Sequence, residues 1–263
     1  MSYIMNEMAV KDIQEVLEKT KTAVIPVGVV EQHGYHLPLG TDTIRASEFV
    51  KRAADAGMNA VVLPVIPYCY SGGELAGTIN VSPQIFTLLV VDIITELERI
   101  GFLHVVIFMG HGGTDNVNVL TSGIRTSLKK NHALRKMSVS IINSSKVSPL
   151  CRKYAQMTPE HDFHAGIVET SALMYLRPDL VKMDELIMDD EEVARKMRMD
   201  QDYFEKEVKV IDDEHVLSIP VQREEVKIGV MGFPEEASVE LGRKITEEIA
   251  EGLKTYVNNL QLM

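Results

Sequence analysis

The densest group of polar side chains follows an apolar run and spans residues 31–42, where the chain reads EQHGYHLPLGTD. Glu31, His33 and Asp42 supply carboxylate and imidazole groups, which are ligands that zinc, manganese and iron accept in proteins. Glu31 and His33 are two positions apart, so they share one side of an extended backbone. Asp42 also begins a helical pattern, where the helix dipole favours an anion. The segment therefore predicts metal ligands, and a simple helix cap remains the alternative for Asp42.

Two later segments carry the other candidate residues. His111 follows a second apolar run within MGHGGTDN, and the glycines around it let the backbone approach a ligand closely. His164 and Glu169 are five positions apart at the start of a helical pattern, so both side chains can face one cavity. Glu169 has an alternative interpretation as an acid of the first helical turn. The chain lacks the GK[ST] ending of a phosphate loop and the G-x-S-x-G turn of serine hydrolases, which favours metal chemistry.

Apolar runs and amphipathic segments alternate along the chain, and this alternation predicts parallel strands joined by helices. We expect buried strands at residues 23–30, 60–63, 103–109 and 137–142. We expect helices from Ser82 and Pro83 to Gly101, from Asp115 to His132, and over 241–257. The first two candidate clusters follow the first and third strands. Because open α/β sheets bind ligands at the carboxyl ends of their strands, the pattern places these residues at one edge of a sheet.

Composition and charge limit the classes of protein that fit. With 263 residues, the chain is long enough for one large α/β domain over residues 1–263. Its net charge of −11 would repel phosphate groups, so nucleic acid and anionic membrane surfaces are poor partners. Cys69 and Cys151 are too few for a disulfide framework, and no export signal or membrane-spanning apolar stretch is visible. We therefore expect a cytoplasmic protein with a small-molecule substrate.

The segment 188–215 is dense in charge and differs from the rest of the chain. Its thin apolar face is formed by Val193, Met197, Phe204 and Val208. A surface helix exposed to solvent is the expected structure, and a contact between subunits is the alternative.

Several blocks of the sequence resemble the creatininase (creatinine amidohydrolase) family. The first block, from Pro26 to Asp42, is highly specific, and the others gain their specificity from their order. The later blocks are GHGG at 110–113, HAG-x-x-ETS at 164–171, LRPDL at 176–180 and GVMGFP at 229–234.

The resemblance implies an α/β/α sandwich around a mainly parallel sheet, with a binuclear metal centre. By position, it implies that Glu31 and His111 hold one metal, that His33 holds the other, and that Asp42 bridges both. His164 matches a family histidine that contacts the substrate. The implied cofactor is a pair of divalent ions, with zinc expected and manganese or iron as alternatives. The resemblance also implies a homo-oligomer, a hexamer built as a trimer of dimers.

The chain departs from the family pattern at one metal ligand. Creatininase proper has a glutamate two residues after the histidine that matches His111, and here that position is Gly113. His33 and a shared Asp42 would leave the second metal with two protein ligands, whereas a catalytic zinc commonly has three. Glu169 is therefore the candidate substitute, and the alternative is His36, which lies three residues beyond His33 and could instead orient the loop.

Two further departures concern the loops near the expected substrate. The segment SGGELAGT at 71–78 lacks the His and Phe-Pro that the family has ahead of Gly-Thr, and Thr114 and Asp115 precede Asn116 where many members read GHGGN. The segment 71–78 is expected near the substrate, so these departures leave the identity of the substrate open.

Together these features predict a metal-dependent hydrolase that acts on a carbon–nitrogen bond other than a peptide bond, in a cyclic amide such as creatinine or in a formamide. His164 is expected to pass a proton to the leaving nitrogen, and Glu31 or Glu169 could share this work, although a metal-bound carboxylate is a poor base. One alternative keeps the metal site and opens a cyclic keto-inositol at a carbon–carbon bond. The other alternative is a metal-binding oligomeric protein without catalysis.

Overall fold

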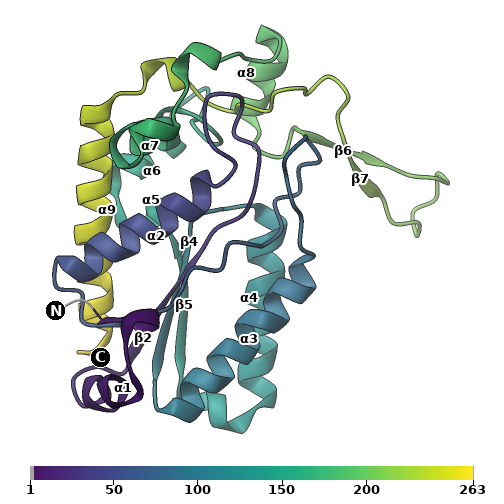
Figure 1. Ribbon diagram of the computed structural model, residues 1–263. Helices are drawn as coiled ribbons and strands as arrows, with labels where there is room; N and C mark the ends of the chain where they lie inside the picture. Colours follow the sequence, from purple (N-terminus) through teal and green to yellow (C-terminus); the bar gives the residue numbers. More distant parts are fainter. Residues whose placement is uncertain (1–2, 263) are drawn as a thin grey trace.

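Two six-residue apolar strands form the centre of a parallel sheet that carries helices on both faces (Figure 1). The computed structural model describes residues 3–262. All strand pairs of the sheet are parallel, in the order β1-β3-β2-β4-β5. The strands are β1 (Tyr3–Ile4), β2 (Thr22–Val27), β3 (Val61–Val62), β4 (His104–Met109) and β5 (Ser138–Asn143).

The helices include several long segments that cover the sheet. They are α1 (Val10–Leu17), α2 (Thr41–Asp55), α3 (Pro83–Ile100), α4 (Thr114–Lys130), α5 (Ser144–Val147), α6 (Pro149–Ala155), α7 (Ile167–Leu176), α8 (Glu191–Met199) and α9 (Val239–Leu260). Short 3₁₀ turns lie at Met5–Glu7, His132–Lys136, Pro178–Leu180, Met183–Glu185 and Pro234–Glu236. Within residues 3–262, no helix combines the length and the apolar composition that crossing a bilayer requires.

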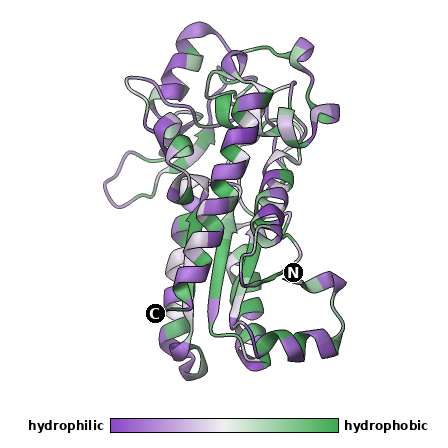
Figure 2. Cartoon of the chain, turned by 90° about the vertical axis from the view of Figure 1, so that its left-hand side faces the viewer, coloured by the Kyte–Doolittle hydropathy of each residue, from purple (hydrophilic) through white to green (hydrophobic). Residues whose placement is uncertain are grey.

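Alternate residues of the central strands point to opposite faces of the sheet, and each face packs against its own helices. Ile25 and Ile107 belong to the core beneath α3 and α4, whereas Val24 and Val106 belong to the core beneath α2, α7 and α9. Figure 2 shows the strands as an apolar layer behind helices with hydrophilic outer surfaces. Because both faces are covered, the strands read as continuous apolar runs in the sequence.

The neighbouring strands β2 and β4 are followed by helices on opposite faces of the sheet, α2 on one face and α4 on the other (Figure 1). This reversal opens a crevice at the carboxyl ends of the two strands, where open α/β sheets bind ligands. The connection from Val27 to Thr41 and the connection from Met109 to Thr114 border this crevice. The fold therefore brings residues that are far apart in the sequence to one place.

The predicted α/β/α architecture with a mainly parallel sheet is confirmed. The four predicted strands correspond to β2, β3, β4 and β5, although β2 ends at Val27 and not at residue 30. The predicted helices correspond to α3, α4 and α9. The short strand β1 and the helix α1 lie in a segment for which the sequence pattern predicted no element.

The prediction of a surface helix over residues 188–215 is wrong for its second half. The helix α8 ends at Met199, and an antiparallel hairpin follows, formed by β6 (Glu205–Val208) and β7 (Ile219–Gln222). The hairpin projects from the body of the molecule (Figure 1). Phe204, which was assigned to the helical face, instead packs beside Met197 and Val226 in a small separate core.

Gly242 lies where α9 meets α7, and a Cβ atom there would overlap the backbone oxygen of Ser171. We expect Gly242→Ala to lower the free energy of unfolding by about 1–3 kcal/mol, because the added methyl group forces the helices apart. The higher helix propensity of alanine alone would stabilise the same variant by up to about 1 kcal/mol. The sign of the change in the free energy of unfolding therefore shows which of the two effects is larger. Urea denaturation measures it, with Gly73→Ala as a control because its nearest neighbour would lie 3.6 Å away. An unchanged or raised stability of Gly242→Ala would contradict this packing.

Candidate metal centre

The connections after β2 and β4, together with the starts of α2 and α7, bring the five predicted ligand residues into one buried cluster. Each of the five is at most 9% exposed. Their ligand atoms form two sets, in each of which all atoms lie within 4.8 Å of one another. The first ligand set is Glu31, Asp42 and His111, and the second ligand set is His33, Asp42 and Glu169. Asp42 belongs to both sets, so each set has three protein residues that could hold a metal ion.

In the first ligand set, two carboxylates face one imidazole nitrogen. Nδ1 of His111 lies 3.0 Å from Oε2 of Glu31 and 3.4 Å from Oδ2 of Asp42. The hydroxyl of Ser71 donates to Oε1 of Glu31 at 2.6 Å, which leaves Oε2 directed at His111. Burial raises the pKa of Glu31, but His111 and other imidazoles outweigh burial, and the pKa is lowered. Glu31 is therefore an anion at neutral pH, as a metal ligand must be.

In the second ligand set, the orientation of His33 is fixed by the backbone. Nδ1 of His33 donates to the backbone oxygen of Glu31 at 3.1 Å, so in the neutral imidazole Nε2 carries the lone pair. Nε2 lies 3.4 Å from Oε2 of Glu169 and 3.7 Å from Oδ1 of Asp42. The backbone N–H of Ala165 donates to Oε2 of Glu169 at 2.8 Å and holds this carboxylate in place.

Four atoms of the two sets have no hydrogen-bond partner although they are buried. They are Oε2 of Glu31, Oδ2 of Asp42, Nε2 of His33 and Nε2 of His111. Buried polar atoms are normally paired, and an unpaired one costs free energy. Divalent cations in the two sets would satisfy the first three of these atoms, and carboxylate with imidazole suits zinc, manganese or iron. The residues present therefore fit a pair of metal ions.

The carboxylates raise the pKa of the imidazoles that they face. Burial lowers the pKa of His33, but Asp42 and Glu169 outweigh burial and hold it well above its ordinary value. Burial likewise lowers the pKa of His111, and Glu31 and Asp42 raise it well above that value. Since an imidazole binds metal only in its neutral form, metal binding at these residues has to release protons.

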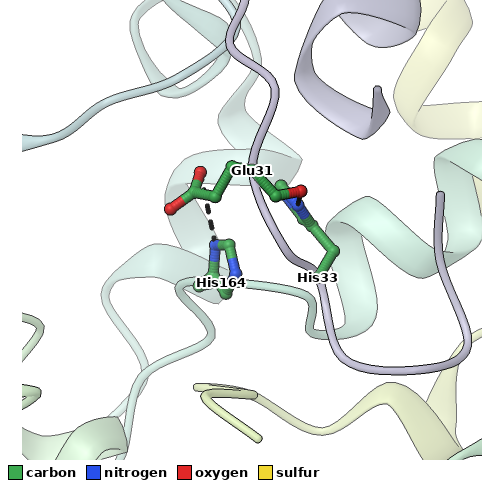
Figure 3. Close-up of side chains that lie close together, drawn as sticks. All are labelled: Glu31, His33 and His164. Carbon is green, nitrogen blue, oxygen red and sulfur yellow. Dashed lines mark hydrogen bonds and ion pairs between the residues drawn. The ribbon is translucent and has the colours of Figure 1, made fainter. Parts of the chain in front are cut away.

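His164 lies beside Glu31 and His33, and the three form a further group that could hold a metal (Figure 3). Its ring lies 4.1 Å from the His33 ring, and its Nε2 donates to the backbone oxygen of Gln32 at 2.8 Å. Nδ1 therefore keeps its lone pair and lies 4.0 Å from Oε2 of Glu31. Burial and the neighbouring His33 lower the pKa of His164, so this imidazole is neutral at neutral pH and able to accept a proton.

Arg45 also belongs to the cluster, although the sequence patterns did not predict it. It follows Asp42 by three positions on α2, and its guanidinium donates to Oδ1 of Asp42 at 3.2 Å and to Oε1 of Glu169. Burial raises the pKa of Glu169, but Arg45 and His33 outweigh burial and lower it to about 2. The three-residue spacing from Asp42 was the signal that could have revealed it, because residues three apart share a helix face.

The lack of a side chain at Gly113 explains why the second ligand set takes its third residue from α7. A Cβ atom at Gly113 would collide with Nε2 of His111, so this arrangement has no room for a side chain there. His36, the other candidate, lies elsewhere, with Nε2 at 3.0 Å from the hydroxyl of Thr170. The backbone oxygen of His36 accepts a hydrogen bond from Lys182, so His36 orients the loop. Among these candidates, Glu169 is the residue that faces His33.

A cavity of about 590 Å³ lies over the ligand residues. The segment 71–78, which was expected near the substrate, forms part of its wall through residues 71–73, Leu75 and Thr78. The segment between α8 and the hairpin also contributes, through Gln201, Asp202 and Phe204, and so does the hairpin itself, through Glu205, Glu207, Pro220 and Gln222. The ligand residues and the wall of the cavity thus come from different parts of the chain.

The sequence of residues 6–257 matches the family model of creatininase, described as creatinine amidohydrolase. The chain belongs to the creatininase family. It is therefore a creatininase-family hydrolase, with a candidate metal site in its buried Glu, Asp and His residues.

Three curated relatives show the range of the creatininase family. Creatinine amidohydrolase of Pseudomonas putida is 31% identical over 183 residues, which cover 62% of this chain and 67% of the relative. Mycofactocin precursor peptide peptidase of Mycolicibacterium smegmatis is 31% identical over 170 residues, covering 62% of this chain and 61% of the relative. The 3-dehydro-scyllo-inosose hydrolase of Thermotoga maritima is 30% identical over 109 residues, which cover 40% of this chain and 34% of the relative.

Solved creatininase structures share the fold over nearly the whole chain. A manganese form has a TM-score of 0.78 at 22% identity, and the match covers 98% of both chains. A variant of the Zn-Zn type has a TM-score of 0.76 at 25% identity, with the same coverage. Metal ions of both kinds are thus named for structures of this fold.

Asp162 holds the loop that carries His164, since its buried carboxylate accepts hydrogen bonds from the backbone N–H groups of Ile167, Val168 and Phe233. We expect Asp162→Ala to lower the free energy of unfolding by at least about 2 kcal/mol, because it leaves buried donors unpaired. Asp190→Ala removes one exposed helix cap on α8 and should cost less. Urea denaturation of the two variants makes the comparison, and an equal or smaller loss for Asp162→Ala would contradict the role of this carboxylate.

Proposed function

We propose that the chain is a metal-dependent amidohydrolase that breaks a non-peptide carbon–nitrogen bond in a small molecule, a cyclic amide or a formamide. The observation that carries this proposal is the pair of buried ligand sets that share Asp42 beside a cavity. Paired metal sites of this kind are typical of hydrolytic enzymes. The membership of the creatininase family supports the same chemistry.

In this proposal Glu31 and His111 hold one divalent ion, His33 and Glu169 hold the other, and Asp42 contacts both. Zinc is the expected metal, with manganese or iron as alternatives, because these ions accept mixed imidazole and carboxylate ligands. Bound metal would supply Lewis acidity, which lowers the pKa of water toward neutrality and polarises an amide carbonyl.

His164 would handle the proton. Its Nδ1 is unprotonated, so it can accept a proton when water attacks the substrate and can return that proton to the leaving nitrogen. The hydrogen bond to the backbone oxygen of Gln32 keeps the ring in this orientation throughout. Glu169 contacts Arg45 and His33, and its low pKa makes it a weak base, so its proposed role is that of a ligand.

The relatives favour cleavage of a carbon–nitrogen bond over cleavage of a carbon–carbon bond. The creatinine amidohydrolase and the peptide peptidase each match 62% of the chain, whereas the inosose hydrolase matches 40%. The opening of a cyclic keto-inositol remains the second candidate, because the inosose hydrolase is still 30% identical over 109 residues.

The proposal includes a homo-oligomer, a hexamer formed as a trimer of dimers. On α3, Ile85, Leu88 and Leu89 are 62%, 63% and 45% exposed. An exposed apolar patch of this kind is a common contact between proteins. Burial of these side chains against another copy of the chain would remove them from water.

The function is tested by product analysis with the metal-loaded protein. Creatinine, other cyclic amides, formamides and a cyclic keto-inositol are each incubated with protein reloaded with zinc or manganese, and products are identified by NMR. We expect a carbon–nitrogen bond to break, and the activity to disappear in Asp42→Asn, which keeps the size of the side chain but loses the charge that both ligand sets share. Turnover of the keto-inositol alone would favour the second candidate. No turnover of any substrate by fully loaded protein would contradict catalysis.

Glu169→Gln tests the ligand assignment of the second set. We expect this variant, at excess zinc, to keep the metal held by Glu31 and His111, to lose the other, and to lose turnover by at least about 100-fold. Elemental analysis and a rate measurement give the two values, and Glu251→Gln, an exposed change on α9, is the control. Two retained metal equivalents with near-normal turnover would contradict the ligand role. Glu169 would then be an acid of the first helical turn, which stabilises a helix by about 0.3–1 kcal/mol.

A further inference from the structure

The two ligand sets differ in their positively charged neighbours. The guanidinium of Arg45 contacts the second set, at Oδ1 of Asp42 and at Oε1 of Glu169. Within residues 3–262, no lysine or arginine lies within ion-pair distance of Glu31, which pairs with imidazoles. Oδ2 of Asp42 therefore faces the first set without a hydrogen-bond partner, whereas Oδ1 faces the second set and already has a cation beside it.

Arg45 carries a permanent charge in a confined position. Its side chain is 5% exposed and reaches the cluster from the second turn of α2. The guanidinium also lies 5.8 Å from the ring of Phe49 one turn further along the helix. Arginine stays protonated in proteins, so this charge is present under all ordinary conditions.

The charges of the cluster balance with one divalent ion. Glu31, Asp42 and Glu169 are buried carboxylates, and Arg45 offsets one of their charges. With neutral imidazoles, a single divalent ion would cancel the remaining charge, and a second ion would leave an excess of positive charge in a buried site, where it is costly. Asp162, another buried carboxylate nearby, uses both of its oxygens for backbone N–H groups. Gly113 adds no carboxylate that could compensate for Arg45.

We propose that Arg45 makes the two metal positions unequal, so that the first ligand set holds its ion tightly and the second ligand set holds its ion loosely. Binding of the second ion requires Arg45 to give up its contact with Oδ1 of Asp42. This inference rests on the proposed metal-dependent function, and it adds a residue that controls metal occupancy without binding the metal. The second ion then exchanges with the surrounding solution more readily than the first.

Calorimetric titration of the metal-stripped full chain with zinc, and separately with manganese, tests the inference. We expect two equivalents in the wild type whose dissociation constants differ by about tenfold or more. Arg45→Met removes the charge and keeps most of the bulk, so it should tighten the second equivalent by about tenfold or more and change the first by less than about threefold. Arg45→Lys keeps the charge and should keep the difference. Arg52→Met, on the same helix with a side chain that is 40% exposed, should match the wild type.

Equal dissociation constants in the wild type would overturn the inference. A second equivalent that weakens in Arg45→Met would also overturn it, because Arg45 would then be a residue that positions Asp42 and Glu169 for the metal. If Arg45→Met does not fold, the wild-type constants and the variant Arg45→Gln decide the question by the same criteria. Absence of any metal binding by the folded wild type would instead contradict the proposed function.

Discussion

The carboxylate of Asp42 is the contact on which the rest of the candidate site depends. One of its oxygens faces His111 and the other faces His33 and Arg45. Its place is set by the fold, because α2 begins beside the crevice between β2 and β4 and packs against both strands. The glycine at position 110 allows this approach, since a Cβ there would meet the backbone oxygen of Asp42. The sheet, the helix and the loop after β4 thus meet at this one side chain.

Bringing several carboxylates together in the interior opposes folding unless positive charge accompanies them. Burial raises the pKa of Asp42, and His33 and His111 outweigh burial and hold it well below its ordinary value. The cluster therefore stays ionised because imidazoles and one guanidinium surround it. A cation that binds only the folded chain would add to its stability by mass action, which links the integrity of the site to that of the fold.

The parts of the structure that were predictable are those with local causes. Strands buried on both faces produce apolar runs, and Ser82 with Pro83 marks a helix start, so most elements could be recognised from a few neighbouring residues. The grouping of Glu31, His33, Asp42 and His111 was also predictable, because parallel strands end at one edge, whereas Glu169 was added to it from the family resemblance. Arg45 was missed because an arginine three residues after an aspartate is common on exposed helices, and only the packing of α2 against α7 reveals that this one is buried. The hairpin was missed because its strands are short and charged, and Phe204 gains its partners from distant residues such as Val226.

The base and part of the wall of the cavity are formed by different parts of the chain. The base comes from segments locked into the sheet and its covering helices, whereas part of the wall comes from residues 201–207 and 220–222, at the root of a hairpin that projects from the body. Substitutions or insertions in the outer hairpin, where Val210, Ile211 and Leu217 are exposed, therefore encounter few packing constraints. Such a division lets evolution alter the shape and charge of the wall while the chemistry at the base is retained. A single architecture can in this way give rise to enzymes with different substrates, as the varied names of its relatives illustrate.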